Sequence, residues 1–328
     1  MADVLSEDNI SLRILNFGDF VNLDVPVREM VMAPVLPVQG LAMVYAPRGL
    51  GKTFFALGLA HAVAGGGPFL RWNAPQPRRV LYVDGKMPAA LMKERTNLVI
   101  RGTGYAVLNL DNLRILSADL QGDVQLDVST VEGQELINRH ISDVEVVVLD
   151  NLASLHLVGG ESEGDSWLQM QAWLLQLRRC GKSVLIVHHS GKGGQQRGTS
   201  RREDVLDTVM ALRRPSDYSP AQGARFEVHL EKARGLHGPD TDPFEAQLQN
   251  TPSGGVRWTT ESMHDVNRLK VISTAEGGLT VAEIATETGL SRSVVGRIRK
   301  AAVDAGELDN AWKEGAAGSE RQGPTKVI

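Results

Sequence analysis

The feature that most constrains the fold of this chain is a short loop, residues 46–53, that ends in Gly-Lys-Thr. The apolar run before it, residues 41–45, is typical of a buried strand, and the Ala- and Leu-rich run after it, residues 54–64, predicts a helix. A glycine-containing loop between a strand and a helix binds phosphate, because its backbone N–H groups and the helix N-terminus form a site for anions. The chain is therefore expected to have an α/β fold organised around a phosphate site.

Individual residues of this loop have distinct expected roles. Lys52 would reach the β- and γ-phosphates of a bound nucleotide, and the Thr53 hydroxyl would bind Mg²⁺. The first glycine of the usual pattern is replaced by Ala46, which fits if this residue keeps a negative φ angle. Gly-Lys-Thr also occurs by chance in loops, but the flanking strand and helix favour a phosphate loop. The residues expected around the nucleotide are Pro47, Arg48, Gly49, Leu50, Gly51, Lys52, Thr53 and Phe54.

Length and composition define the broad class of the protein. At 328 residues the chain exceeds a typical single domain, which predicts one large domain with a smaller one. The formal net charge of -4 gives no basic surface overall, so any contact with nucleic acid must be local. The apolar stretches are too short to span a membrane and no secretory signal is visible, which predicts a cytoplasmic protein without a membrane partner. The single cysteine, Cys180, excludes an internal disulfide and is expected to be a small core residue.

Apolar strands alternate with helices over most of the chain. This alternation predicts a mostly parallel sheet with helices on both faces. The last strands of the region are expected to close the sheet. The expected strands are residues 79–84, 113–117, 144–150, 183–188, 208–212, 225–233 and segments within 244–258, and the expected helices are 54–64, one ending at residue 100, 130–140 and 166–179.

Asp150 is the candidate for a second group at the metal. It ends the strand 144–150, which we expect to lie beside the phosphate loop. A carboxylate there can hold Mg²⁺ through water while Thr53 binds it directly. The alternative is an Asp that only caps the following segment. The apolar run before Asp150 and the phosphate loop upstream favour the metal role.

After residue 260 the pattern changes from strands to short helices. Residues 266–275 are expected to be helical, and two further helices joined by a tight turn at Gly289 form a helix-turn-helix pattern. Residues 308–312 could start a wing. Basic residues on or near the second helix suit contact with DNA, although such modules also dock proteins; they are Arg292, Arg297, Arg299 and Lys300.

The chain is thus expected to have four parts. A leader precedes an α/β nucleotide-binding domain, which a winged-helix-like domain and a small, polar, flexible tail follow. The corresponding residues are 1–30, 31–260, 261–314 and 315–328.

The motifs also occur in a distinctive order along the chain. After the phosphate loop come Tyr82-Val83-Asp84-Gly85, Val148-Leu149-Asp150, Val187-His188-His189-Ser190, Arg197-Gly198-Thr199-Ser200 and Lys232-Ala233-Arg234. This order resembles the RecA/DnaB superfamily and, within it, the plasmid-encoded RepA-type hexameric helicases, over about residues 25–250. The resemblance implies a RecA-like P-loop NTPase core that hydrolyses ATP, with ATP and Mg²⁺ at a subunit interface. It also implies a ring of six identical subunits and single-stranded DNA as the partner.

The resemblance assigns catalytic roles to residues beyond Lys52 and Asp150. His189 would be a polar sensor between the nucleotide and the polymer-binding loop, and a hydrogen-bonded structural histidine is the alternative. Lys232 and Arg234 end a strand where DnaB-like proteins place residues that act on the γ-phosphate of the adjacent subunit. An Arg donated in this way neutralises the charge that develops in phosphoryl transfer.

A basic loop follows the strand of the histidines. It contains Lys192, Arg197, Arg201 and Arg202. These side chains would contact DNA phosphate in the channel of a ring, or Arg197 would reach the ATP of the neighbouring subunit. A solvated basic loop is the alternative. Between Arg197 and Arg234, the sequence does not decide which is the trans-acting residue.

One residue departs from the family pattern. RecA-like ATPases end the second strand in a sequence such as Asp-Gly-Glu, whereas this chain has Asp84-Gly85-Lys86. A charged Lys cannot accept a proton from the attacking water, and Asn151, not a carboxylate, follows Asp150. The residues thus support ATP binding more strongly than hydrolysis. Either Asp84 substitutes as the base, or the change is a natural or engineered inactivation of the site. The alternatives to a helicase are an ATP-switched DNA-binding regulator and a RecA-like ATPase that acts on protein complexes.

Overall fold

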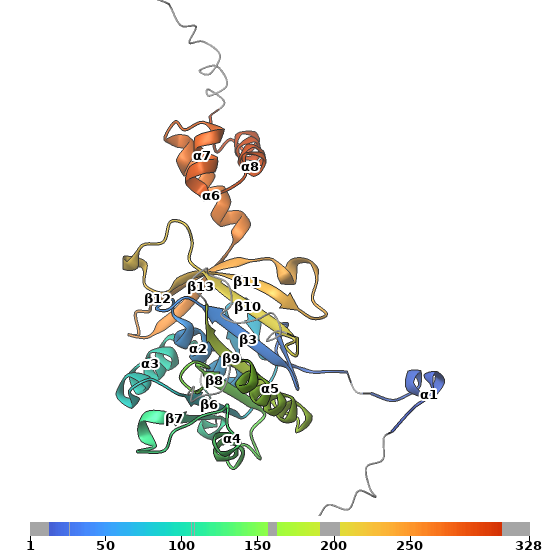
Figure 1. Ribbon diagram of the computed structural model, residues 1–328. Coiled ribbons are helices and arrows are strands. Elements are labelled where there is room, and N and C mark those ends of the chain that lie inside the picture. Colours follow the sequence, from blue (N-terminus) through green and yellow to red (C-terminus); the bar gives the residue numbers. More distant parts are fainter. Residues whose placement is uncertain are drawn as a thin grey trace, which may run out of the picture.

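The computed structural model describes residues 13–25, 27–105, 107, 109–156, 163–190 and 204–309. Figure 1 shows a central sheet with helices on both of its faces. The helices α6, α7 and α8 stand beyond one end of the sheet, and the short helix α1 (Phe17–Val21) lies away from the body. No helix within the described ranges is both long and apolar enough to cross a membrane.

The large sheet, within the described residues, has nine strands in the order β13-β12-β11-β10-β3-β9-β8-β6-β7. In this order, every pair of adjacent strands from β10 through β3, β9, β8 and β6 to β7 is parallel. On the other side of β10, the strands β11, β12 and β13 each pair antiparallel with the strand before them. The predicted α/β fold with a mostly parallel sheet is confirmed. The strands are β3 (Leu41–Ala46), β6 (Val80–Asp84), β7 (Leu113–Ser117), β8 (Val146–Asp150), β9 (Ser183–His189), β10 (Thr208–Arg213), β11 (Arg225–Ala233), β12 (Phe244–Asn250) and β13 (Val256–Ser262).

One prediction about the sheet is wrong: β8, which ends at Asp150, does not lie beside the strand of the phosphate loop. β9 lies between them, and its Val184 pairs with Leu41 on one side and Val147 on the other. The chain reaches β9 from β8 through a long connection that includes α5 (Glu163–Arg179). Such a crossover can return on either side of the preceding strand, so chain order alone did not determine strand order.

Cys180 is also placed differently from the prediction. It is exposed, because α5 ends at Arg179 and Cys180 lies in the turn that follows. The buried face of α5 is formed instead by Trp173, Leu174 and Leu177. The predicted helix 166–179 ends at the same residue as α5, but Cys180, one residue beyond it, is not part of the core.

The two faces of the sheet have separate hydrophobic cores, because successive side chains of a strand point to opposite faces. Val44 and Ala46 of β3 pack under α2 (Lys52–Gly65) and α3 (Ala89–Gly102), whereas Met43 and Tyr45 pack under α4 (Val131–Asn138) and α5. Almost every residue of α2 is buried, so the helix that begins at the phosphate loop is fixed by packing along its length. Short 3-10 helices lie at Leu110–Asn112, Ala118–Leu120, Pro220–Gln222 and Gly238–Thr241.

Small hairpins attach the N-terminal part of the chain to the core. β1 (Met30–Met32) pairs with β2 (Leu36–Pro37), and β4 (Pro68–Phe69) pairs with β5 (Trp72–Asn73). Val31, Met32, Val35 and Leu36 are all buried in the core under α2. By contrast α1 buries none of its residues. Burial in the core therefore begins at β1, and the division into leader and core domain stays a prediction.

The C-terminal helices form a compact group with a small core of its own. α6 (Met263–Glu276), α7 (Val281–Thr288) and α8 (Arg292–Asp304) enclose buried residues from all three helices. A capping box of Thr280 and Glu283 begins α7, Gly289 at φ 72° ends it, and Ser291 caps α8. These residues determine where α7 begins and ends and where α8 begins. No wing strand is found up to residue 309, and the rest of the predicted wing and the tail lie outside the described residues, so the winged-helix domain stays a prediction.

Candidate nucleotide-binding site

The phosphate loop lies at the carboxyl end of β3 and leads directly into α2. Gly49 and Gly51 have φ angles of 78° and 99°, in the left-handed region that favours glycine. Ala46 is the last residue of β3 and is absent from the residues with positive φ, so its methyl group causes no strain there. The glycine pattern of the sequence is thus explained by the backbone of the loop.

The two glycines differ in what surrounds them, which makes a testable pair. A Cβ atom added at Gly51 would lie 2.7 Å from the Cβ of Ala224, whereas one added at Gly49 would meet no atom within 4 Å. Gly49→Ala is expected to cost about 1–2 kcal/mol of stability from the left-handed backbone alone. Gly51→Ala adds an overpacking cost of roughly 1–3 kcal/mol and should lower the melting temperature further. Equal melting temperatures for the two variants would contradict this packing.

A cavity of about 630 Å³ opens in front of this loop. The loop forms its floor, the start of α3 forms one wall, and the segment between β10 and β11 forms another. Of the residues predicted to bind the nucleotide, Pro47 and Leu50 do not line the cavity, and the Leu50 side chain is buried in the core. The lining residues are Arg48, Gly49, Gly51, Lys52, Thr53, Phe54, Asp84, Lys86, Met87, Pro88, Leu91, Arg95, Asp150, Asn151, His189, Tyr218, Pro220, Gly223 and Ala224.

Lys52 is folded back against its own loop. Its Nζ donates hydrogen bonds to the carbonyl oxygens of Ala46 at 2.8 Å and Pro47 at 2.6 Å. Burial lowers the pKa of Lys52 to about 8, and the charges of Lys86 and Arg48 act in the same direction while Asp150 opposes them. A bound anion would oppose this lowering of the pKa, because Nζ would then face a negative charge in place of neutral carbonyl oxygens. Lys52 is therefore in place to bind phosphate.

Asp150 and Thr53 lie together at the predicted metal position. Burial raises the pKa of Asp150, while hydrogen bonds from Tyr82 and Thr53 oppose the rise. The Tyr82 hydroxyl donates to Oδ2 of Asp150 at 2.6 Å. A carboxylate and a hydroxyl are the oxygen ligands that suit Mg²⁺. In the described ranges no group of three or more His, Cys, Asp or Glu residues could hold a metal, so phosphate oxygens and water would have to complete the coordination.

Asp84 is a second acidic residue that lines the cavity. It pairs in register with Asp150 across β6 and β8, and its Oδ2 accepts a hydrogen bond from the Met87 N–H at 2.9 Å. Burial raises the pKa of Asp84 to about 6, with Asp150 adding to the rise and the Met87 and Lys86 N–H groups opposing it. A carboxylate with this pKa can accept a proton near neutral pH. Lys86, at the position where the resemblance to RecA-like ATPases predicts a Glu, also lines the cavity.

The two histidines at the end of β9 have different surroundings. His189 lines the cavity, whereas His188 is buried. Burial lowers the pKa of His189 to about 4, and the positive charges of Lys52 and Arg48 lower it further. His189 is therefore neutral at physiological pH, and its buried Nδ1 has no hydrogen-bond partner among the described residues. A neutral imidazole beside the phosphate position can both accept and donate a hydrogen bond.

The residues predicted to act on a neighbouring subunit do not line this cavity. Lys232 and Arg234 lie at the end of β11 and donate to the Asp204 carbonyl oxygen at 3.4 and 2.6 Å. Because Ala233 pairs with Thr208 at the start of β10, they lie at the edge of the sheet where the parallel strands begin. The phosphate loop lies at the opposite end of these strands, so Arg234 is remote from the cavity of its own chain. Lys192, Arg197, Arg201 and Arg202 lie outside the described residues.

Several residues that line the cavity, Arg95 and Tyr218 among them, were not predicted to contact the nucleotide. The guanidinium of Arg95 lies over the Phe54 ring at 5.2 Å, and that of Arg214 lies over the Tyr218 ring at 5.1 Å. Arg95 could have been suspected from its place on the helix after Asp84. Tyr218 had no comparable signal, because its segment lies far from the phosphate loop in sequence and meets it only through the order of the strands.

A phosphate loop at the carboxyl end of a parallel sheet, with an Asp on a strand two positions away, defines the P-loop nucleotide-binding proteins with a RecA-like ATPase fold. Residues 7–195, more than half of the chain, match the family described as AAA domain, and the chain belongs to this family.

A solved structure shares this fold. A KaiC-like protein from the hyperthermophilic archaeon Pyrococcus horikoshii OT3 is similar at a TM-score of 0.51 and 15% identity, over 71% of this chain and 100% of that one. The flagellar accessory protein FlaH from Methanocaldococcus jannaschii aligns at a TM-score of 0.47 and 12% identity, over 68% of this chain and 91% of its own. No curated protein matches the sequence.

Proposed function

We propose that this chain is a cytoplasmic ATPase that assembles into a ring, most simply a hexamer, and acts on DNA as RepA-like helicases do. The observation that carries the ATPase proposal is the grouping of Lys52, Thr53, Asp150 and Asp84 around one cavity. Lys52 would bind the β- and γ-phosphates, and Thr53 and Asp150 would hold Mg²⁺, directly and through water. Mg²⁺ would supply charge neutralisation at the γ-phosphate.

Asp84 would act as the general base, a role that a charged Lys86 cannot perform. Its pKa of about 6 leaves it ionised at neutral pH and still basic enough to accept a proton from water. His189 would be the sensor, since it lies in the same cavity in neutral form and can respond to the γ-phosphate through a hydrogen bond. Arg234 or Arg197 would then complete the site from a neighbouring subunit.

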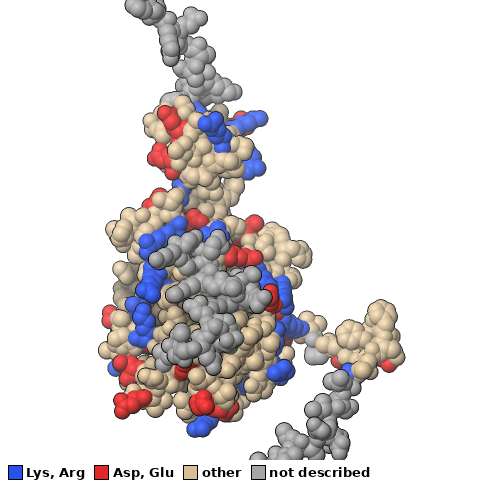
Figure 2. All heavy atoms as spheres, in the orientation of Figure 1, with Lys and Arg blue, Asp and Glu red and all other residues tan. Residues whose placement is uncertain are grey.

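Two features support DNA as the partner. The helix-turn-helix of α7 and α8 carries the exposed side chains of Arg292, Arg297 and Lys300, and Figure 2 shows Lys and Arg gathered on these C-terminal helices. A local basic surface on a chain of net negative charge fits contact with phosphate backbones. The loop with Arg197 would supply a second contact inside the ring.

A second candidate function is an ATP-switched DNA-binding regulator with weak hydrolysis. Lys86 in the cavity favours it, because a positive charge near the γ-phosphate strengthens ATP binding without assisting the attack of water. Turnover measured with and without single-stranded DNA, together with the mass of the assembly by light scattering, separates the candidates. A helicase-type ring gives DNA-stimulated turnover, whereas a regulator gives sequence-selective DNA binding and no unwinding. A monomer without DNA-stimulated turnover would contradict the helicase, and a chain whose DNA binding does not respond to nucleotide would contradict the regulator.

The pH dependence of kcat/KM provides a further test. Asp84 must be ionised to act as a base, so the rate should rise with pH through its pKa of about 6. Lys52 must be charged to bind phosphate, so the rate should fall with pH through its pKa of about 8. We expect a bell-shaped profile for the free enzyme, whose acid limb disappears in Asp84→Asn along with most of the activity. An acid limb that persists in that variant would contradict the assignment.

A further inference from the structure

The segment between β10 and β11, residues 214–224, touches both the phosphate loop and the part of the chain that leads to the C-terminal helices. Its inner side contributes Tyr218, Pro220, Gly223 and Ala224 to the wall of the cavity. Ala224 packs so closely on Gly51 that no side chain fits between them. Any ligand that fills the cavity must therefore contact this wall or displace it.

Hydrogen bonds within the segment make it stiff. Ser219 and Gln222 form a capping box around a single 3-10 turn, and the Tyr218 hydroxyl donates to the Gly223 carbonyl at 3.0 Å. Arg214 lies over the Tyr218 ring and places Nη2 3.5 Å from the Arg48 carbonyl of the phosphate loop. We expect such a segment to respond to a ligand as a unit, because its ends continue into β10 and β11 and its centre is held by hydrogen bonds.

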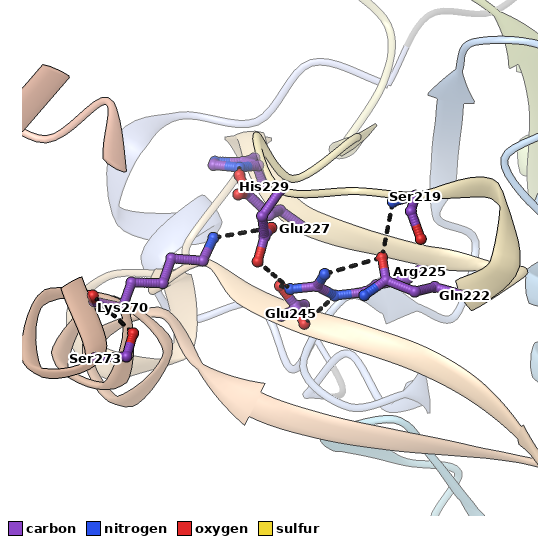
Figure 3. A network of polar contacts seen from close by, with 9 residues as sticks. Ser219, Gln222, Arg225, Glu227, His229, Glu245, Lys270 and Ser273 are labelled. Atoms are coloured by element: carbon purple, nitrogen blue, oxygen red, sulfur yellow. Dashed lines mark hydrogen bonds and ion pairs between the residues drawn. The ribbon is translucent and has the colours of Figure 1, made fainter. Parts of the chain in front are cut away.

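The outer side of the segment is tied to the sheet and to α6 by a chain of charges (Figure 3). Arg225 makes a two-pronged pair with Glu245 of β12, at 2.7 and 2.8 Å, and both side chains are buried. Asp217 accepts from Arg225 at 3.2 Å with one oxygen and from Lys270 of α6 at 3.1 Å with the other. Burial acts to raise the pKa of Asp217, but the hydrogen bonds from Lys270 and Arg225 bring it below its usual value, so Asp217 is charged.

Lys270 lies on the helix that joins the sheet to the helix-turn-helix. Ser262, the last residue of β13, is the N-cap of α6, and Val271 and Ala275 of α6 belong to the small core shared with α7 and α8. The pair of Asp217 and Lys270 thus connects the wall of the nucleotide cavity to the C-terminal module by one contact between side chains.

We propose that residues 214–224 form a nucleotide-responsive link that transmits occupancy of the cavity to α6 through the ion pair of Asp217 and Lys270. The proposal rests on the proposed binding of ATP. A nucleotide contacts Tyr218 and the Gly51–Ala224 packing, which stabilises one position of the segment. Asp217 moves with the segment and holds α6 more firmly through Lys270, so the orientation of the module depends on the nucleotide. A module whose helix α8 is basic, controlled in this way, changes its DNA contact with the ATP cycle.

Hydrogen–deuterium exchange of the full chain, with and without a non-hydrolysable ATP analogue and Mg²⁺, tests the link. We expect the analogue to slow exchange in residues 46–58, in 214–224 and in α6. In Lys270→Met the first two effects should remain, while the effect on α6 falls by about two- to fivefold, the range for a partly exposed ion pair. Lys270→Arg should keep the response of α6.

The matched control is Arg268→Met, which breaks an ion pair of the same helix to Glu307 at 2.7 Å and leaves Lys270 intact. This control should keep the response of α6 to the nucleotide. Slowing at 46–58 without slowing at 214–224 or in α6 would overturn the link, as would an unchanged α6 response in Lys270→Met. No slowing at 46–58 would instead overturn nucleotide binding itself, so the two failures are distinguishable.

Discussion

Lys52→Ala should lower the affinity for Mg²⁺·ATP by about 10- to 150-fold, since a hydrogen bond to a charged group contributes about 1.5–3 kcal/mol. The Lys52 ammonium is almost fully buried at the floor of the cavity, held by the Ala46 and Pro47 carbonyls. Water therefore screens it little, and its attraction for phosphate is strong. Isothermal titration with a non-hydrolysable ATP analogue measures the loss.

The control for this variant is Lys93→Ala, which removes an exposed lysine of α3. It should bind the analogue like the parent chain. Because Lys52→Ala also leaves two loop carbonyls without their donor, its melting temperature is recorded alongside. A folded Lys52→Ala protein with unchanged affinity would mean that the cavity does not bind phosphate through this residue.

The second large effect is expected at Asp84. If Asp84 is the general base, Asp84→Asn lowers turnover by about 10²–10⁴-fold, the usual contribution of such a group. Binding of Mg²⁺·ATP should change far less, since Thr53 and Asp150 remain. Steady-state phosphate release gives the rate, and titration of the analogue gives the affinity. Glu94→Gln, an exposed change on α3, is the control.

Lys86→Glu completes this comparison. It places a carboxylate where the family has its glutamate and removes a charge that lowers the pKa of Lys52. We expect turnover to rise by at least about an order of magnitude, because a second carboxylate can then orient the attacking water. Full activity in Asp84→Asn would show that another residue supplies the base. No gain in Lys86→Glu would show that position 86 does not limit the rate.

Much of the fold could be predicted from periodicity and turn residues. The strand at β7, for example, was expected at 113–117 and is found at Leu113–Ser117. The phosphate loop was also predictable, because its chemistry lies in consecutive residues that a strand and a helix flank. Both features depend on short runs of consecutive residues, so the sequence is enough to predict them.

What could not be predicted depends on contacts between distant segments. The position of β9 between β3 and β8 is one case, and the wall formed by residues 214–224 is another. The pKa of Asp84 is a third, because burial under the rest of the chain raises it. The sequence identified Asp84 as a possible substitute for the missing glutamate, but only its burial gives a physical reason why it could act as a base near neutral pH.

The most direct test of the central claim, that this cavity binds Mg²⁺·ATP, is a titration of the unmodified chain with a non-hydrolysable ATP analogue in the presence and absence of Mg²⁺. We predict saturable binding at one site per chain that weakens strongly when Mg²⁺ is removed, because Thr53 and Asp150 then lose the ion they hold against the phosphates. Absence of binding, or binding of equal strength without Mg²⁺, would contradict the account.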